Sequence, residues 1–120
     1  MAHQRMQLGS YGEKVVERYL EQEQFTILAK NFRKRDGEVD LIARKGLLTI
    51  FVEVKTRHTH SVDPTEIITP AKQRKIARAA AFFTAQEDCD YVCRFDVAVV
   101  TVESSGPSIM YIADAFQAEG

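Results

Sequence analysis

The sequence predicts an α/β protein in which a mixed β-sheet is flanked by helices, with its elements in the order αβββαββ. Two stretches repeat apolar residues at helical spacing, five others are rich in β-formers, and 120 residues suffice for one core. A mixed sheet covered by helices is the layered arrangement that buries the apolar faces of such elements. We therefore expect residues 1–120 to form a single domain, with a core over about 9–116.

Composition excludes several classes of protein. Hydrophobic residues make up 45% and charged residues 28% of the chain, so the sequence is not of a disordered type. No apolar run reaches the roughly 18 residues of a membrane span, and the amino terminus lacks the apolar stretch of a secretory signal. We therefore expect a cytoplasmic protein without a membrane partner. Cys89 and Cys93 offer two ligands where structural zinc requires four, so we expect reduced thiols.

Charge is distributed unevenly along the chain although the net charge is only -1. Residues 84–120 carry seven acidic residues and one basic residue, whereas basic residues concentrate at 30–35 and 72–78. A localised cationic surface can guide a polyanion even when the total charge is near zero. On charge alone, however, two ordinary solvated faces are the favoured interpretation.

The first half of the chain predicts one helix and then three strands. Ser10 stands three residues before Glu13, which is the spacing of a capping box, and apolar residues at helical spacing follow. This pattern predicts a helix over about 11–24. A tight hairpin centred on Lys45–Gly46 is expected between the last two strands, because glycine tolerates positive φ. The strands are expected over residues 25–32, 38–44 and 47–56.

The second half of the chain predicts a loop, a helix and two strands. Residues 58–68 are polar and lack a clear period, and a loop of this length suggests a functional role. Thr69 and Pro70 supply an N-cap and a first-turn proline for a helix that extends to about 85. The remaining strands are expected over 94–102 and 108–116.

The stretch 47–55 contains the most informative residues. Its apolar residues fall on both parities, which is typical of a central strand covered on both faces. Glu53 and Lys55 break this pattern, and because they are two positions apart they project from the same face. Burying an ionised group costs several kcal/mol unless it is paired or bound to metal. These residues therefore form either a structural ion pair at the end of the strand or part of a functional site.

The preceding strand favours a functional site. The expected hairpin places Asp40 opposite Phe51 and Glu38 opposite Glu53, so that Asp40 shares the face of Glu53 and Lys55. The carboxylates of Asp40 and Glu53 are then diagonal neighbours, with backbones about 7–8 Å apart. Two acidic groups so placed repel each other unless a proton or a divalent cation intervenes, and hard oxygen ligands suit Mg²⁺ or Mn²⁺.

Six short motifs resemble those of the YraN-like uncharacterised proteins, in the same order. These are Gly9–Glu13, Asn31–Arg33, Gly37–Ala43, Phe51–Arg57, Lys72–Lys75 and Arg94–Val97. That family is similar to a branch of the PD-(D/E)XK, or restriction-endonuclease-like, nucleases that is related to Holliday-junction resolvases. The match spans about residues 9–102. Glu53, Val54 and Lys55 correspond to the (D/E)XK half of the motif, and Asp40 takes the aspartate position, although Val39 replaces the proline before it.

The resemblance implies a restriction-endonuclease-like fold and a metal held by Asp40, Glu53 and the main-chain carbonyl of Val54. It implies that Lys55 lies near the attacking water. Glu13 matches the acid of the first helix, where it either supports catalysis or the metal, or serves only as the capping-box partner of Ser10. The resemblance further implies contacts to backbone phosphates from Arg33, Arg35, Lys72 and Lys75.

Other polar and aromatic residues have two interpretations each. Gln73 lies at the start of the apolar stripe of the second helix, where it is either a boundary residue or able to reach a carboxylate or a phosphate. His58 and His60 lack a third metal ligand, so ordinary loop residues are favoured. Asp96 is expected to cap a helix or loop rather than act in catalysis. Phe82 and Phe83 are expected in the core rather than as a base-stacking platform.

These observations favour a magnesium-dependent endonuclease-like protein that binds and cleaves structured or branched DNA by phosphodiester hydrolysis. A dimer is expected, because one site must serve two strands. The main alternative is a module that retains the fold without turnover and binds nucleic acid or a protein. A third hypothesis is metal-dependent phosphohydrolysis of a smaller substrate.

Overall fold

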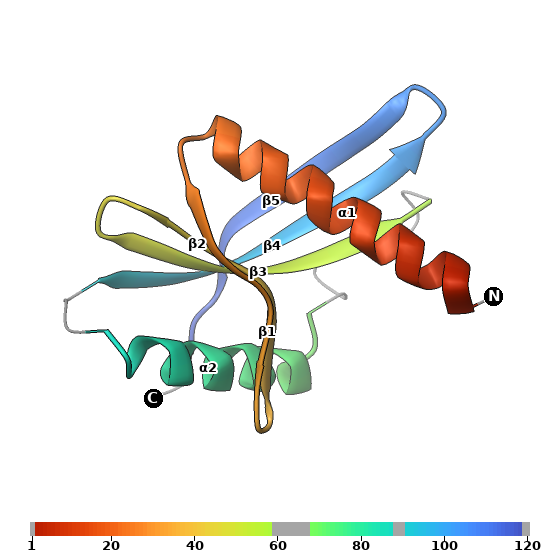
Figure 1. Ribbon diagram of the computed structural model, residues 1–120. Coiled ribbons are helices and arrows are strands. Elements are labelled where there is room, and N and C mark those ends of the chain that lie inside the picture. The colour runs from red at the N-terminus through yellow and green to blue at the C-terminus, as the bar shows by residue number, and fades with distance from the viewer. Residues whose placement is uncertain (1, 59–67, 88–90, 119–120) are drawn as a thin grey trace.

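The structure, a computed structural model, describes residues 2–58, 68–87 and 91–118, and side chains within these ranges from residue 8 onward. Two helices cover opposite faces of one five-stranded sheet (Figure 1). The elements are α1 (Ala2–Gln22), β1 (Thr26–Lys34), β2 (Gly37–Lys45), β3 (Leu48–Arg57), α2 (Pro70–Thr84), β4 (Val92–Glu103) and β5 (Gly106–Phe116). The predicted fold class and element order are confirmed.

The sheet is mixed because one of its connections is a crossover. Strands follow one another in the order β1-β2-β3-β4-β5, and every neighbouring pair is antiparallel except β3 and β4. A parallel pair requires a long connection, and α2 provides it on one face of the sheet. β3 is therefore central and covered on both faces, as its apolar residues on both parities predicted.

Each helix buries one apolar stripe against the sheet. Val16 and Leu20 of α1 pack with Val52 on one face, and Ile76 of α2 packs with Phe51 on the other. The α2 face is rich in aromatic rings, which contact one another edge-on or stacked and include Phe32, Phe51, Phe83, Phe95 and Phe116. The predicted core position of Phe83 is confirmed.

Helix α1 begins much earlier than the sequence predicted. It starts at Ala2, so Ser10 lies inside the helix and the predicted capping box of Ser10 with Glu13 is wrong. Glycine and serine inside a helix cost only about 1 kcal/mol or less each, so Gly9, Ser10 and Gly12 do not end it. Glu13 is thereby free to make a tertiary contact.

The hairpin between β2 and β3 turns one residue later than predicted. Lys45 pairs with Leu48 and Leu41 with Val52, so the turn residues are Gly46 and Leu47. Gly46 has a φ of 60°, which suits the first central position of a two-residue hairpin turn. Every partner in the ladder therefore differs by two positions from the predicted one.

The shift in register changes the neighbours of the acidic residues without changing their face. Because side chains alternate with a period of two, Asp40 keeps the predicted face and moves from Phe51 toward Glu53. The predicted pairing of Glu38 with Glu53 is wrong, since the ladder of β2 with β3 ends at Leu41 and Val52 and its register brings Asp40, not Glu38, opposite Glu53.

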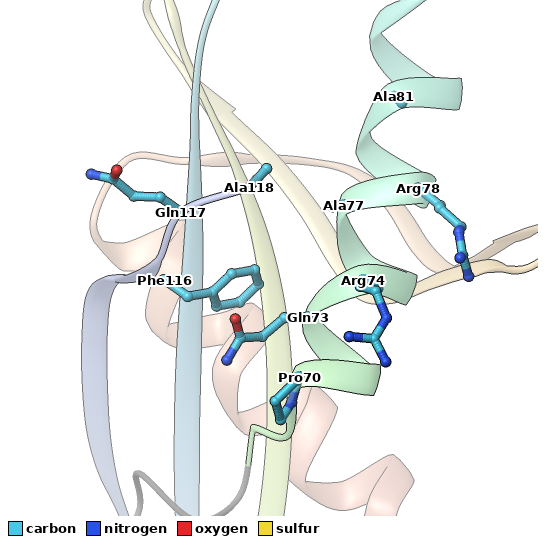
Figure 2. A pocket seen from close by; sticks show the side chains of 9 residues that line it. All are labelled: Pro70, Gln73, Arg74, Ala77, Arg78, Ala81, Phe116, Gln117 and Ala118. Carbon is cyan, nitrogen blue, oxygen red and sulfur yellow. The ribbon is translucent and has the colours of Figure 1, made fainter. Parts of the chain in front are cut away.

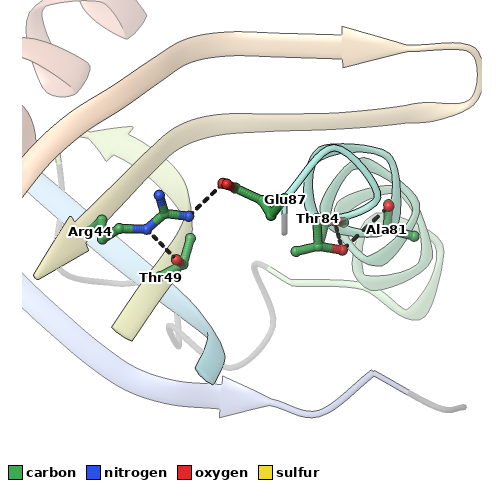
Figure 3. Close-up of polar contacts among 6 residues, drawn as sticks. Arg44, Thr49, Ala81, Thr84 and Glu87 are labelled. Atoms are coloured by element: carbon green, nitrogen blue, oxygen red, sulfur yellow. Dashed lines mark hydrogen bonds and ion pairs between the residues drawn. The ribbon is translucent and has the colours of Figure 1, made fainter. Parts of the chain in front are cut away.

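Helix α2 is fixed at both of its ends. Thr69 accepts a hydrogen bond from the Lys72 amide and Pro70 is the first helical residue, as the sequence predicted. Beyond the other end, Glu87 accepts a 2.6 Å bond from Arg44, whose guanidinium also donates to Thr49 (Figure 3). This cluster ties the segment after α2 to β2 and β3, and so sets where β4 enters the sheet.

One of the two cysteines, Cys93, lies within the described residues. Cys93 is exposed and forms no disulfide, whereas Cys89 lies outside the described residues. Within the ranges that the structure describes, none of the helices combines the length and apolarity needed to cross a bilayer.

Gly37 provides a test of the contact between the β1–β2 hairpin and α2. A Cβ at this position would lie 2.6 Å from the Ala79 backbone nitrogen, so Gly37→Ala must push α2 away. We expect overpacking to cost about 1–3 kcal/mol and to lower the melting temperature by about 5 °C or more. Thermal unfolding followed by circular dichroism measures this.

Gly9→Ala is the matched control. Nothing lies within 4 Å of a Cβ at Gly9, which is inside α1, so this substitution should raise stability by up to about 1 kcal/mol. Equal changes in melting temperature for the two variants would contradict the close approach of the hairpin to α2.

Candidate active site

An open pocket of about 420 Å³ lies where the paired part of β2 and β3 ends. Residues from α1, β1, β2, β3 and α2 contribute to it, so elements far apart in the sequence meet there. Its lining residues are Leu8, Gly9, Glu13, Arg33, Glu38, Asp40, Glu53, Val54, Lys55, Thr56 and Lys72. The pocket thus contains both predicted carboxylates, the predicted lysine and the predicted acid of the first helix.

The Asp40 side chain takes the place of a backbone hydrogen-bond acceptor at the end of the β2–β3 pair. The ladder of β2 with β3 ends at Leu41 and Val52, and beyond it the Asp40 carboxylate accepts a 2.7 Å hydrogen bond from the Val54 amide. The N–H and C=O of one strand residue project toward the same neighbouring strand, so the Val54 carbonyl faces this edge too. One aspartate therefore ends the strand pairing and orients a carboxylate into the pocket.

Asp40 lies close enough to Glu53 for the charge of Glu53 to affect the ionisation of Asp40. Burial, together with the negative charge of Glu53, raises the pKa of Asp40 to about 7, while the bond from Val54 opposes the shift. Glu13 adds a smaller repulsion. Four acidic and three basic side chains line the pocket, and burial disfavours the charged form of Asp40, so a bound cation would relieve the excess negative charge.

Lys72 neutralises part of this charge from the first turn of α2. Its ammonium lies 2.9 Å from a Glu53 carboxylate oxygen, and the Glu53 side chain is only 12% exposed. Burial lowers the pKa of Lys72, but the hydrogen bond with Glu53 and the charges of Glu53, Asp40 and Glu38 outweigh it, so the pKa is raised. The sequence predicted Lys72 as a phosphate contact, whereas the structure pairs it with a candidate metal ligand.

Lys55 and Glu13 occupy the pocket in different ways. Lys55 is exposed and forms no hydrogen bond or ion pair with the described residues, so its ammonium is available to a ligand. Glu13 accepts a 3.1 Å hydrogen bond from the Asn31 side chain across the α1–β1 contact. Asn31 was missed as a positioning residue. Its φ of 50° is a conformation in which asparagine is enriched, and only the Asn31–Arg33 motif marked it in the sequence.

The other three predicted phosphate contacts, Arg33, Arg35 and Lys75, lie beside the carboxylates, and Arg33 also lines the carboxylate pocket. Arg33 and Lys75 both approach Glu38, at 3.7 and 3.8 Å, and Arg35 lies over the Phe82 ring. These ion pairs are largely exposed and hence weak. A second open pocket, of about 300 Å³, contains the three cations together with Arg78.

Gln73 lies away from the carboxylates. Its side-chain amide donates a 3.3 Å hydrogen bond to the Ile68 carbonyl and lines a groove between α2 and the residues after β5 (Figure 2). The predicted reach to a strand-end carboxylate is therefore wrong, because the residue sits on a different side of α2 from Lys72.

The donor set fits a hard, oxygen-preferring divalent cation better than zinc. Among the described residues, no three His, Cys, Asp or Glu side chains are grouped closely enough to hold a metal ion. Mg²⁺ is usually bound by one or two carboxylates and several waters, which two acids and a main-chain carbonyl can satisfy. Asp40, Glu53 and Val54 are therefore suitable in type for Mg²⁺ or Mn²⁺, and unsuitable for a zinc centre.

Asp96 is structural and lies outside the pocket. It is fully buried in β4, where it accepts bonds from Arg94, from the Tyr111 hydroxyl at 2.5 Å and from the Asp114 amide. The expectation that Asp96 caps a helix or loop is wrong, because the register of β4 and β5 is interrupted there and the carboxylate fills the irregularity. His58 is exposed at the end of β3, and His60 lies outside the described residues.

The fold and pocket define a class: an α/β protein whose mixed sheet carries paired carboxylates at the end of a strand pair. Residues 12–100 match the family model described as "Uncharacterised protein family UPF0102", and the chain belongs to this family. The chain is 43% identical over 112 residues to a UPF0102 protein of Geobacter metallireducens, covering 92% of both proteins. It is 43% identical over 119 residues to one of Geobacter sulfurreducens, covering 97% of this chain and 93% of the relative.

A further relative, a UPF0102 protein of Chlorobium chlorochromatii, is 43% identical over 122 residues, covering 94% of this chain and 93% of the relative. The matched range 12–100 contains the pocket residues Asp40, Glu53, Lys55 and Lys72. The resemblance to the YraN-like proteins is thereby confirmed as family membership.

The partly buried Asp40 and the fully buried Asp96 allow a test of the electrostatics of the pocket. In EDTA, Asp40→Asn should raise the melting temperature by about 5–10 °C at pH 8 and have little effect near pH 4. A folded-state pKa of about 7 against 3.8 means that the folded chain retains a proton that the unfolded chain releases. Wild-type stability therefore falls as pH rises from about 4 to 7, and the amide avoids this loss.

Asp96→Asn is the control, with the opposite expected sign. Its carboxylate is satisfied by Arg94, Tyr111 and a backbone amide, so loss of the charge should lower the melting temperature. A lower melting temperature for Asp40→Asn at pH 8 would show that the pocket does not hold excess negative charge.

Proposed function

We propose that this protein is a metal-dependent endonuclease-like protein that binds structured or branched DNA and cleaves it by phosphodiester hydrolysis. The observation that supports the proposal most is the meeting of Asp40 and Glu53 in one open pocket with the Lys55 ammonium, which none of the described residues pairs. Two carboxylates and a lysine at this spacing suit a reaction in which negative charge develops on a phosphate.

The chain's own residues have distinct roles in the proposed reaction. Asp40 and Glu53, with the Val54 carbonyl, would hold the cation, and Val54 keeps Asp40 oriented through its amide. When bound, Mg²⁺ or Mn²⁺ supplies Lewis acidity and favours hydroxide over water. Lys55 orients the attacking oxygen and offsets the charge that develops on the phosphate. Glu13, held by Asn31, borders the same space and supports the cation indirectly.

Lys72 has a separate role as an internal counter-ion. It contacts the Glu53 oxygen that a divalent cation requires, so cation and ammonium compete for the same carboxylate. With Glu53 engaged by a cation, Lys72 would be available to the phosphates of a substrate. This exchange accounts for both the observed ion pair and the phosphate contact that the family resemblance implies.

The cations beside the pocket provide the binding surface for DNA. Arg33, Arg35 and Lys75 surround a pocket at the tip of the β1–β2 hairpin, next to the carboxylates. The ion pairs of Arg33 and Lys75 with Glu38 are long and exposed, so a phosphate can displace them at little cost. A local cationic surface of this kind binds a polyanion despite the net charge of -1.

A module that binds nucleic acid without turnover is the second candidate function. The Lys72–Glu53 ion pair favours it, because an internal ammonium already neutralises one of the two proposed ligands. Metal-independent DNA binding with no cleavage would support this alternative.

A homodimer and a cytoplasmic location stay predictions.

Cleavage assays test the enzymatic proposal. Wild-type protein should cut one or more of junction, flap, single-stranded and duplex DNA in Mg²⁺ or Mn²⁺, and EDTA should abolish cutting. Glu53→Ala and Lys55→Ala should each reduce the rate at least about 100-fold, since each removes a group that interacts with the reacting phosphate or its cation. Cutting that survives the double substitution would indicate contamination and refute the activity.

Metal titration tests the role of Lys72 without any cleavage. Lys72→Gln removes the competing ammonium, so Mn²⁺ should bind about tenfold more tightly by calorimetry at pH 7.5. Lys75→Gln is the matched control, because Lys75 lies one turn along the same helix and pairs with Glu38. The same gain in Mn²⁺ affinity in both variants would show that the gain comes only from the change in overall charge. No gain in Lys72→Gln would refute the proposed competition between Lys72 and the cation for Glu53.

A further inference from the structure

A groove of about 420 Å³ separates α2 from the residues that follow β5 (Figure 2). It lies on the side of α2 away from Lys72 and is not part of the carboxylate pocket. One rim carries two arginines, and the floor carries small or aromatic side chains. The residues that line it are Pro70, Gln73, Arg74, Ala77, Arg78, Ala81, Phe116, Gln117 and Ala118.

The two arginines are free to bind an anion. Arg74 and Arg78 are both exposed, and neither forms an ion pair or hydrogen bond with the residues that the structure describes. Because they are four positions apart, they lie on one face of α2 with an axial separation of about 6 Å. Guanidinium groups so placed favour bidentate binding of phosphate.

The floor of the groove suits a flat aromatic group. The Phe116 ring is held in place by stacking on Phe95, with ring centroids 5.0 Å apart, and Ala77 leaves space in front of it. Gln73 lies next to Phe116 in Figure 2 and uses one amide hydrogen for the Ile68 carbonyl. Its side-chain carbonyl oxygen and second hydrogen can therefore bond the edge of a base.

The groove is continuous with the surface proposed to bind DNA. Arg78 lines both the groove and the neighbouring cationic pocket. Arg33 and Glu38 line both that cationic pocket and the carboxylate pocket. The three pockets thus adjoin one another around α2, and a chain of phosphates following the cations would reach the groove.

We propose that the groove binds one unpaired nucleotide of the DNA, with its base against Phe116 and its phosphate on Arg74 and Arg78. The inference rests on the proposed function and narrows its substrate. A paired base is stacked inside the duplex and cannot enter a pocket, whereas an unpaired base can stack on an aromatic side chain. The substrate is therefore DNA with unpaired nucleotides near the scissile phosphate, not continuous duplex.

Equilibrium binding in EDTA tests this without catalysis. Fluorescence anisotropy would compare a single-stranded oligonucleotide with a duplex of the same length, and 2-aminopurine in the strand would report stacking of its base. Wild-type protein should bind the single strand more tightly and quench the 2-aminopurine. Arg74→Ser with Arg78→Ser should weaken single-strand binding about tenfold and lower the salt slope by about 0.7 per arginine, with a smaller effect on duplex.

A second variant changes the shape of the groove and leaves its charge unchanged. Ala77→Leu fills the floor of the groove without changing charge and favours helix, so it should abolish the quenching while the protein stays folded. Phe116 is left intact because it packs on Phe95 in the core. Lys14→Ser with Arg18→Ser is the matched control, since it removes two exposed cations four positions apart on α1.

Several outcomes would overturn the inference. Three results would each refute binding of a nucleotide in the groove without contradicting the proposed function. These are equal losses of affinity for single strand and duplex, an equal loss of affinity in the α1 control, and unchanged quenching in Ala77→Leu. Competition by a polyglutamate peptide as effective as that by the oligonucleotide would assign the groove to an acidic protein partner. Failure of the wild-type protein to bind any DNA would refute the proposed function as well.

Discussion

The hydrogen bond from the Val54 amide to the Asp40 carboxylate is the interaction on which the candidate site depends. At this point a side chain replaces the partner strand, so the ladder of β2 with β3 ends and the strand edge opens into a pocket. A strand interior would leave no space for a ligand, and an unpaired amide would be costly when buried. The aspartate satisfies the amide and brings a carboxylate next to Glu53, so one residue both completes the backbone hydrogen bonding and creates the acidic site.

The charges around Asp40 and Asp96 show how burial acts differently in a functional site and in a core. Asp96 is fully buried, and its oxygens are bonded by a guanidinium, a hydroxyl and a backbone amide. Asp40 has one amide, a neighbouring carboxylate and partial burial, and its pKa rises to about 7. Lys72 reaches Glu53 but leaves this repulsion in place. Of these two aspartates, only the one in the open pocket therefore carries an electrostatic repulsion that its neighbours do not relieve.

Helix α2 organises the surfaces around the site. Its first turn contributes Lys72 to the carboxylates, and its middle contributes Lys75 and Arg78 to the cationic pocket. The opposite side lines the groove with Arg74. These placements depend on the close contact of the β1–β2 hairpin with the helix, where Gly37 has no space for a Cβ. Because an α-helix distributes consecutive residues around its axis, the basic run that looks like one cluster in the sequence serves three different surfaces.

The sequence alone determined the order of the elements, the central position of β3 and the face that Asp40 shares with Glu53. These features depend on local propensity, on the two-residue period of a strand and on turn residues, all of which can be read along the chain. Only the tertiary structure decided the early start of α1, the exact partners across the β2–β3 hairpin, the bond of Asn31 to Glu13 and the separation of Gln73 from Lys72. A one-residue change of turn preserves the parity of a strand, so the pattern cannot detect it, and contacts between distant segments leave no period in the sequence.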